Sequence, residues 1–207
     1  MRGRLITIEG LDGAGKTTLA RGVADALAQR GIDVQLLREP GGVAAAERIR
    51  TLVKDPGLHV APRAEALLYA AARAQLVEEA LAPALAAGRW ILLDRFVDSS
   101  LAYQGAGRSL GTEPVRAINA FATGGVAPDR TLLLRIDPAL GRARQDDRGD
   151  AADRLELEAD DFFARIAAAY DELAAVEPQR IRTLDARADA PAVLAQALAA
   201  LEDLLAG

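Results

Sequence analysis

The sequence predicts an α/β fold in which helices cover both faces of a five-stranded parallel sheet. Short apolar runs alternate along the chain with long Ala- and Leu-rich segments that have a helical period. Strands that alternate with helices form parallel sheets, because each crossover helix returns the chain to the same edge of the sheet. A glycine-rich loop also joins the first apolar run to the first helical segment, which is typical of this class.

Five short apolar runs are the predicted strands. They are rich in Leu, Ile and Val with little alternation, as expected for strands that are buried on both faces. The runs are RLITIE (4–9), VQLLRE (34–39), WILLD (90–94), TLLLRID (131–137) and RIRTLD (180–185).

The intervening segments are the predicted helices. The first should run from Lys16 to Arg30 and end at Gly31, since a residue without a Cβ suits the left-handed position after a helix. Asp137 and Pro138 are interpreted as an N-cap and a first helical residue. A bend is expected at Pro83. The remaining predicted helices are 44–53, 62–87, 97–104, 114–123, 138–144, 160–176 and 190–205.

Length and composition favour one compact domain over residues 1–207. With 51% hydrophobic and 27% charged residues, the chain resembles an ordinary globular protein, and its apolar runs are broken by Arg, Glu or Pro. We therefore expect no membrane association. The segment MRGR leads directly into the first strand without the apolar core of a secretion signal, so a cytoplasmic location is expected.

Charge and residue usage exclude several classes of site. The net charge of −5 argues against a general nucleic-acid binder. The absence of cysteine excludes disulfides and thiolate metal sites, and a lone His59 excludes a His-rich zinc site. Of the 25 basic residues only Lys16 and Lys54 are lysines, an arginine excess that coding bias would explain. Magnesium held by oxygen atoms remains open.

Residues 10–17 fit the phosphate-binding pattern G-x-x-x-x-G-K-[ST]. The match lies directly after a predicted strand and opens a predicted helix, which is the context that this motif requires. Its backbone N–H groups can surround phosphate oxygens, Lys16 can reach the outer phosphates, and Thr17 can hold Mg²⁺. The predicted ATP-binding residues are Gly10, Leu11, Asp12, Gly13, Ala14, Gly15, Lys16, Thr17 and Thr18.

A second candidate lies at the end of the run WILLD. Asp94 and Arg95 would lie at the carboxyl edge of the sheet, where doubly wound folds bind ligands. Asp94 can bind Mg²⁺ or its waters, and Arg95 can bridge phosphates; the alternative is an ordinary strand-end salt bridge. The chain has no Asn-Lys-x-Asp motif for guanine, which disfavours a GTPase switch and favours a kinase.

The segment GRARQDDRGDAADRLE, residues 141–156, combines dense charge with a loss of apolar periodicity. We interpret it as a mobile flap. The alternative is a solvated surface turn without a role in chemistry.

Five motifs together resemble the thymidylate kinase family. GLDGAGKTT, REPGG, YAAARAQ, DRFVDSSLAYQG and DRLE follow one another in this order, and the resemblance covers nearly the whole chain. It implies a P-loop nucleoside monophosphate kinase-like fold, transfer of the ATP γ-phosphate to dTMP with Mg²⁺, and a homodimer.

The resemblance also implies roles for the acceptor site. Tyr69 and Arg73 are four residues apart on one predicted helix and so share a face. The family pattern puts the Tyr69 ring against thymine and the Arg73 guanidinium on its carbonyl edge, with Ser100 and Gln104 nearby. Stacking of a base on an aromatic ring contributes about 1 to 3 kcal/mol without selecting the base, so Arg73 would have to select it.

Further roles concern the sugar and the phosphates. Tyr103 resembles the residue that packs where a ribonucleotide carries its 2′-OH, and Asp12 matches an acidic position near the 3′-OH or the metal. Arg38 and Arg95 would hold the acceptor phosphate. The P-loop has Gly13-Ala14 where one branch of the family has an arginine, so the chain resembles the branch with catalytic arginines in the flap. The candidate arginines of the flap are Arg142, Arg144, Arg148 and Arg154. The predicted catalytic residues are Lys16, Arg95, Arg142, Arg148 and Arg154.

Two other functions remain as alternatives. A deoxynucleoside kinase would phosphorylate a sugar hydroxyl and would need a general base such as Glu39. A nucleotide-binding switch would hydrolyse ATP or GTP slowly and ignore dTMP. A nucleoside monophosphate acceptor differs from both. Its phosphate has a second pKa of about 6, so it is mostly dianionic at pH 7 and needs no general base.

Overall fold

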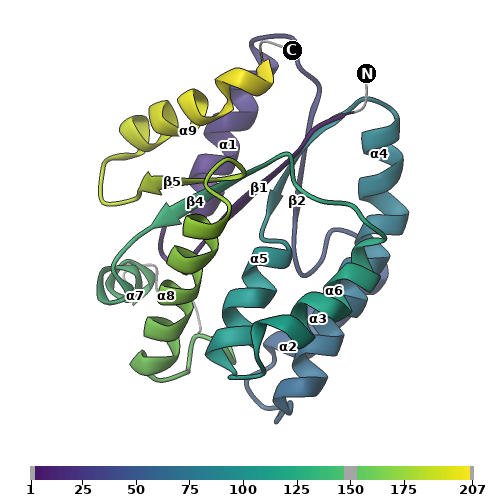
Figure 1. The fold of residues 1–207 in the computed structure, drawn as a ribbon, viewed down its shortest axis with the longest axis vertical. Helices are drawn as coiled ribbons and strands as arrows, with labels where there is room; N and C mark the ends of the chain where they lie inside the picture. Colours follow the sequence, from purple (N-terminus) through teal and green to yellow (C-terminus); the bar gives the residue numbers. More distant parts are fainter. Residues whose placement is uncertain (1–2, 147–152, 206–207) are drawn as a thin grey trace.

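The computed structural model describes residues 3–146 and 153–205 (Figure 1). Within these ranges five strands form one parallel sheet in the order β2-β3-β1-β4-β5, which confirms the predicted class. The strands are β1 (Leu5–Gly10), β2 (Val34–Arg38), β3 (Trp90–Asp94), β4 (Arg130–Arg135) and β5 (Ile181–Asp185).

β1 is the central strand and pairs with β3 on one side and β4 on the other. The chain therefore crosses over in opposite directions from β1, and in open α/β sheets ligands bind at such a switch point. The loop after Gly10 leaves the sheet at this position. In register, Asp94 is beside Ile8 of β1 and Arg38 of β2, so these strand ends meet at one edge.

Helices cover both faces of the sheet, as predicted (Figure 1). Alternation along β1 directs Ile6 and Ile8 into the apolar cluster that contains α1, whereas Leu5 packs in a second cluster with Leu81 and Leu85. α1 (Lys16–Ala28) and α9 (Ala190–Leu205) pack together on one face. The other face carries α4 (Ala82–Ala86), α5 (Val97–Ser100) and α8 (Asp160–Val176), and next to them lie α2 (Ala44–Lys54), α3 (Pro62–Leu76) and α6 (Thr112–Thr123).

Two predicted helices contain π-helical turns that the sequence pattern did not indicate. The predicted helix 62–87 is divided into α3, the π-helix η1 (Val77–Leu81) and α4. Pro83 lacks an N–H and its ring crowds the carbonyl four residues earlier, which a wider turn relieves. The predicted helix 97–104 is α5 followed by the π-helix η2 (Leu101–Gly107), so it extends further than expected.

The start of the predicted flap is helical. α7 (Pro138–Asp146) runs past the predicted end at residue 144, and Asp137 Oδ1 accepts the Ala139 N–H at 2.9 Å, as expected for a cap. Residues 147–152 are outside the described residues. Among the helices of the described ranges, none combines the length and the apolarity needed to cross a membrane.

Candidate functional site

The P-loop follows β1 and requires glycine at two close approaches. Gly10 and Gly13 have φ values of 133° and 79°. A Cβ on Gly10 would lie 2.5 Å from the Leu134 carbonyl oxygen, and one on Gly13 would lie 2.0 Å from that of Gly141. Side chains are thus excluded, and the loop ends at Lys16, the first residue of α1. The resulting helix N-terminus is a site that favours anions.

The Lys16 side chain lies back along this loop. Its Nζ donates to the carbonyl oxygens of Leu11 at 2.9 Å and Gly10 at 3.2 Å, and it is 3.3 Å from Asp12 Oδ1. Burial lowers the pKa of Lys16. Both carbonyl partners are within six residues of the lysine, so the motif itself provides its environment.

Arg95 joins the P-loop to the neighbouring pocket. It follows β3 with a left-handed φ of 71°, and its Nη2 is 2.7 Å from Asp12 Oδ1 and 3.1 Å from the Tyr103 hydroxyl. The guanidinium also lies 4.9 Å from the centre of the Tyr103 ring. Burial alone would raise the pKa of Asp12, but Arg95 and Lys16 hold it well below its ordinary value. Asp12 thus stays ionised and fixes both cations.

A pocket opens beside Arg95, and most of the predicted acceptor residues line it. Its wall is formed by side chains from the P-loop, the turns after β2 and β3, α2, α3, α5, η2 and the last residues of the flap. The lining residues are Asp12, Glu39, Pro40, Lys54, Tyr69, Arg73, Arg95, Ser99, Ser100, Tyr103, Gln104, Asp153 and Leu155. Tyr69 is half-buried there, while Ser100, Tyr103 and Gln104 are buried.

Arg73 reaches this pocket with all five N–H groups occupied by protein acceptors. Nε donates to Glu39 Oε2 at 2.8 Å, and Nη2 donates to the same oxygen and to the Phe96 carbonyl. Nη1 donates to Ser100 Oγ at 2.9 Å and to Asn119 Oδ1. The side chain is 1% exposed. The expected contact with a base therefore requires Arg73 to share a donor that is already bonded.

Glu39 is the acidic partner of Arg73, and its two carboxylate oxygens differ in their hydrogen bonding. Oε2 is bonded to Arg73, whereas the buried Oε1 has no hydrogen-bond partner within residues 3–146 and 153–205. Burial raises the pKa of Glu39. The carboxyl group thus keeps one acceptor position, although its other oxygen serves to hold an arginine.

Arg38 does not line the pocket. Its side chain is 57% exposed and its Nη2 lies 3.2 Å from Glu47 Oε1 of α2. The end of β2 nevertheless places its backbone beside Asp94. The structure therefore places Arg38 at the carboxyl edge of the sheet, with its side chain paired to Glu47 outside the residues that line the pocket.

Thr17 and Asp94 fit the predicted magnesium site. Asp94 Oδ1 is buried, and no group in the described part of the chain hydrogen-bonds it. Thr17 is exposed in the first turn of α1. No three His, Cys, Asp or Glu residues among those described form a metal cluster. This donor set suits Mg²⁺, which takes few protein ligands and completes its shell with water and phosphate oxygens.

The flap arginines differ in their surroundings. Arg142 of α7 donates to the Glu158 carbonyl at 2.9 Å and lines a small hollow with Leu11 and Asp12 of the P-loop. Arg144 donates to the Ala186 carbonyl at 2.9 Å. Arg154 points elsewhere, since its Nη2 lies 2.7 Å from Glu65 Oε2. Arg148 lies outside the described residues.

An apolar hollow extends from the P-loop between α1 and α9. It is lined mainly by small and aliphatic side chains, which can cover the flat face of a nucleobase. Arg144 lines this hollow and not the pocket beside Arg95. The lining residues are Ala14, Gly15, Thr18, Leu19, Gly22, Leu134, Arg144, Ala186, Ala188, Ala190, Pro191, Val193 and Leu194.

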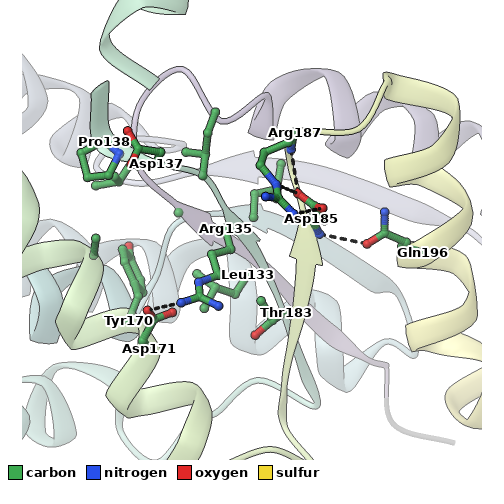
Figure 2. A pocket seen from close by; sticks show the side chains of 15 residues that line it. Leu133, Arg135, Asp137, Pro138, Tyr170, Asp171, Thr183, Asp185, Arg187 and Gln196 are labelled. Carbon is green, nitrogen blue, oxygen red and sulfur yellow. Dashed lines mark hydrogen bonds and ion pairs between the residues drawn. The ribbon is translucent and has the colours of Figure 1, made fainter. Parts of the chain in front are cut away.

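A larger hollow of about 660 Å³ lies between β4, β5 and α8 (Figure 2). Its two arginines are each paired with an aspartate: Arg135 with Asp171 at 2.8 Å, and Arg187 with Asp185 at 2.7 Å. Figure 2 shows these pairs on separate elements rather than converging on one point. Among the described residues, the buried acidic oxygens without a hydrogen-bond partner, Glu39 Oε1 and Asp94 Oδ1, belong instead to the pocket beside Arg95 and to the end of β3.

Two buried acids at the site were not predicted. Glu9, at the end of β1, and Glu65, in α3, are both 0% exposed. Glu65 precedes Tyr69 by four residues and Arg73 by eight, so helical spacing places it on the same face and could have indicated it. No pattern indicates Glu9, because its surroundings come from residues far along the chain.

Comparison with known proteins gives one consistent result. The model of the thymidylate kinase family matches residues 8–196. A thymidylate kinase of Halorhodospira halophila is 46% identical over 206 residues, covering 99% of this chain and 96% of the relative. One of Enterococcus faecalis is 50% identical over 190 residues, 90% of each chain. The crystal structure of thymidylate kinase from Ehrlichia chaffeensis superposes with a TM-score of 0.81 at 26% identity, covering 98% of this chain and all of that one.

Proposed function

The chain belongs to the thymidylate kinase family, and from this premise we propose that it transfers the γ-phosphoryl group of ATP to dTMP, giving dTDP and ADP. One structural observation supports transfer between two bound phosphates. Asp12 of the P-loop, which suits the donor phosphates, is ion-paired with Arg95 of the pocket of Tyr69 and Tyr103, which suits the acceptor. The two phosphates would therefore meet at Arg95.

The chemistry needs positioning and charge neutralisation more than proton transfer. A dTMP phosphate is mostly dianionic at neutral pH and can attack without a general base. The P-loop N–H groups and Lys16 would hold the donor phosphates, while Arg95 would hold the attacking phosphate. Thr17 and Asp94 would hold Mg²⁺, which when bound neutralises charge on the donor phosphates.

Side chains of the pocket would select the acceptor. We propose that Tyr69 stacks on thymine and that Tyr103, fixed by Arg95, excludes a 2′-hydroxyl. Ser100 and Gln104 lie on the same wall and would contact the base. Arg73 would contribute by shaping this wall, and Asp12 would approach the sugar or the metal.

Flap arginines would complete the site at the transferring group. Arg142 is the described candidate with the best support, since it shares a hollow with Leu11 and Asp12. Arg144 would act on the donor side, and Arg148 remains a candidate by resemblance alone. The ion pair of Arg154 with Glu65 favours a positioning role for Arg154.

An acceptor panel tests the proposed reaction. ADP release should be rapid with dTMP and at background with thymidine or without acceptor, and the same assay measures dUMP. As pH falls through about 6, kcat/KM for dTMP should drop because the substrate takes up a proton. Glu39→Gln should preserve that acid limb. Phosphorylation of thymidine that disappears in Glu39→Gln would instead identify a deoxynucleoside kinase, and ATP hydrolysis indifferent to dTMP would identify a switch.

We also propose a homodimer in the cytoplasm, where ATP and deoxynucleotides are available. Phe121 of α6 is 91% exposed, and Leu67 of α3 and Leu52 of α2 are 57% and 41% exposed. These helices lie side by side, so their exposed apolar side chains suit a second copy of the chain (Figure 1). Light scattering on Phe121→Glu should show a monomer if this face forms the interface.

A further inference from the structure

Glu65 is a buried acid that contacts the wall of the acceptor pocket from behind. It lies in α3 and is 0% exposed. Its Oε1 accepts a hydrogen bond from Gln104 Nε2 at 2.9 Å, and its Oε2 lies 3.0 Å from Arg108 Nη2 and 2.7 Å from Arg154 Nη2. Glu65 does not line the pocket, whereas Gln104 does.

This contact determines the direction of the Gln104 amide. An ionised carboxylate only accepts hydrogen bonds, whereas an amide donates from nitrogen and accepts at oxygen. Gln104 must therefore turn its nitrogen toward Glu65, whichever way the amide would otherwise rotate. Its Oε1 takes no hydrogen bond from any donor in residues 3–146 or 153–205. The Gln104 oxygen is thus left to a ligand as an acceptor, beside the second hydrogen of Nε2.

The two guanidinium groups restrict Glu65 further. Arg108 forms hydrogen bonds to both carboxylate oxygens, and it also lies 4.9 Å over the ring of Phe162. Arg154 Nε additionally donates to the Val53 carbonyl at 2.9 Å. These contacts come from separate parts of the chain, so the carboxylate has little freedom to move away from Gln104.

Pyrimidines differ at the atom that such an acceptor would meet. Thymine presents N3–H as a donor, whereas cytosine presents a bare N3 as an acceptor. We propose that Glu65 is a positioning residue that keeps the Gln104 amide oxygen toward the pocket, and so selects a pyrimidine with an N3–H over one without it. This inference rests on the proposed placement of the base beside Gln104.

The test compares dTMP with 5-methyl-dCMP, which keeps the methyl group and changes the hydrogen-bonding edge. Wild type should strongly prefer dTMP, since a buried polar group without a partner is rejected. Glu65→Gln can accept or donate, so the Gln104 amide can turn over. We expect the ratio of kcat/KM values for dTMP over 5-methyl-dCMP to fall about 10-fold. The matched control Glu78→Gln makes the same chemical change at an exposed position of η1 and should leave this ratio unchanged.

A double-substitution cycle separates positioning from general damage. Gln104→Leu should lower the same ratio, and Glu65→Gln should then have no further effect on it. An unchanged ratio in Glu65→Gln, or an equal fall in Glu78→Gln, would overturn the role of Glu65. A wild type that ignores dTMP altogether would instead refute the proposed function.

A second variant is available if Glu65→Gln does not fold. In Gln104→Glu the two carboxyl groups can share one proton, and the oxygen that faces the pocket can still accept. The preference for dTMP should persist in binding titrations with the two nucleotides. A reversal toward 5-methyl-dCMP would show that the natural amide presents its nitrogen to the base, and would overturn the proposal.

Discussion

The P-loop and the acceptor pocket hold their key cations in opposite ways. Lys16 is bonded by groups four to six residues away in sequence, most of them backbone carbonyls. Arg73 is bonded by groups 23 to 46 residues away, most of them side chains, and is 1% exposed. The first environment is built by one continuous segment, whereas the second exists only when several elements of the fold have assembled.

Because of this difference, the two regions should contribute differently to catalysis and to stability. A phosphate can replace the carbonyl partners of Lys16 without disturbing the core, because the loop lies at the edge of the sheet. Loss of Arg73 would leave the Glu39 carboxyl group buried without a cation. Changes in the loop should therefore reduce turnover, and changes in the Arg73 cluster should also reduce the free energy of unfolding.

The largest effect is expected from Lys16→Ala. It should lower kcat/KM for dTMP by more than roughly 10³, because no other group replaces its charge on the outer phosphates. Its unfolding midpoint should stay close to wild type. ADP release and urea unfolding measure both quantities, with Arg21→Ala on the exposed side of α1 as the control. Near-normal turnover would remove the assignment of the loop.

Arg142→Ala should come next. An arginine that acts on charge in the transition state contributes roughly 10² to 10³ or more to kcat, with little effect on ATP binding. Arg154→Ala provides the comparison, and it should alter KM for dTMP more than kcat because Arg154 is ion-paired with Glu65. If Arg142, Arg148 and Arg154 can each be replaced with kcat almost unchanged, residues 141–156 are only a surface segment.

Arg73→Ala tests the other half of the comparison. Removal of one partner from a buried ion pair destabilises proteins by roughly 3 to 5 kcal/mol. Urea unfolding should show a loss of this size, far above that of Lys16→Ala. The double variant Arg73→Met with Glu39→Met should recover much of the stability. A mild effect of Arg73→Ala would mean that water or Asn119 compensates the pair.

The smallest effect concerns pH. Burial and the charge of Asp98 raise the pKa of Glu9 from 4.5 to about 7. Ser99, Arg95 and the Phe96 N–H lower this pKa, but by less. Between these values the unfolded chain has lost the Glu9 proton while the folded chain keeps it, so stability falls as pH rises. The loss should be roughly 2 kcal/mol between pH 4.5 and 7 and should be absent in Glu9→Gln. Thermal unfolding at several pH values would reject this assignment if both proteins show the same slope.

Sequence reasoning succeeded where one segment determines its own structure. The five strands, the P-loop and the cap at Asp137 follow from short-range patterns, and the structure confirms these elements. The identity of the pocket residues came from the resemblance, since no local pattern links Tyr69 to Tyr103. Glu9 and Glu65 were missed because charged residues are usually exposed, and only tertiary partners make their burial tolerable. The engagement of Arg73 by Glu39 and Asn119 depends on the packing of α3 and α6, which the sequence does not reveal.

The π-helical turn η2 makes the number of residues in one segment important for the site. Tyr103 and Gln104 both lie within Leu101–Gly107, where the helix is wider than an α-helix. Such turns arise when a single residue is inserted into an α-helix, and they are frequent at functional sites. A codon deletion here would let the segment wind as an ordinary α-helix and would rotate every later side chain by about 100° relative to the earlier ones. Over evolution, substitutions between residues 101 and 107 should therefore be accepted more readily than the deletion of one residue.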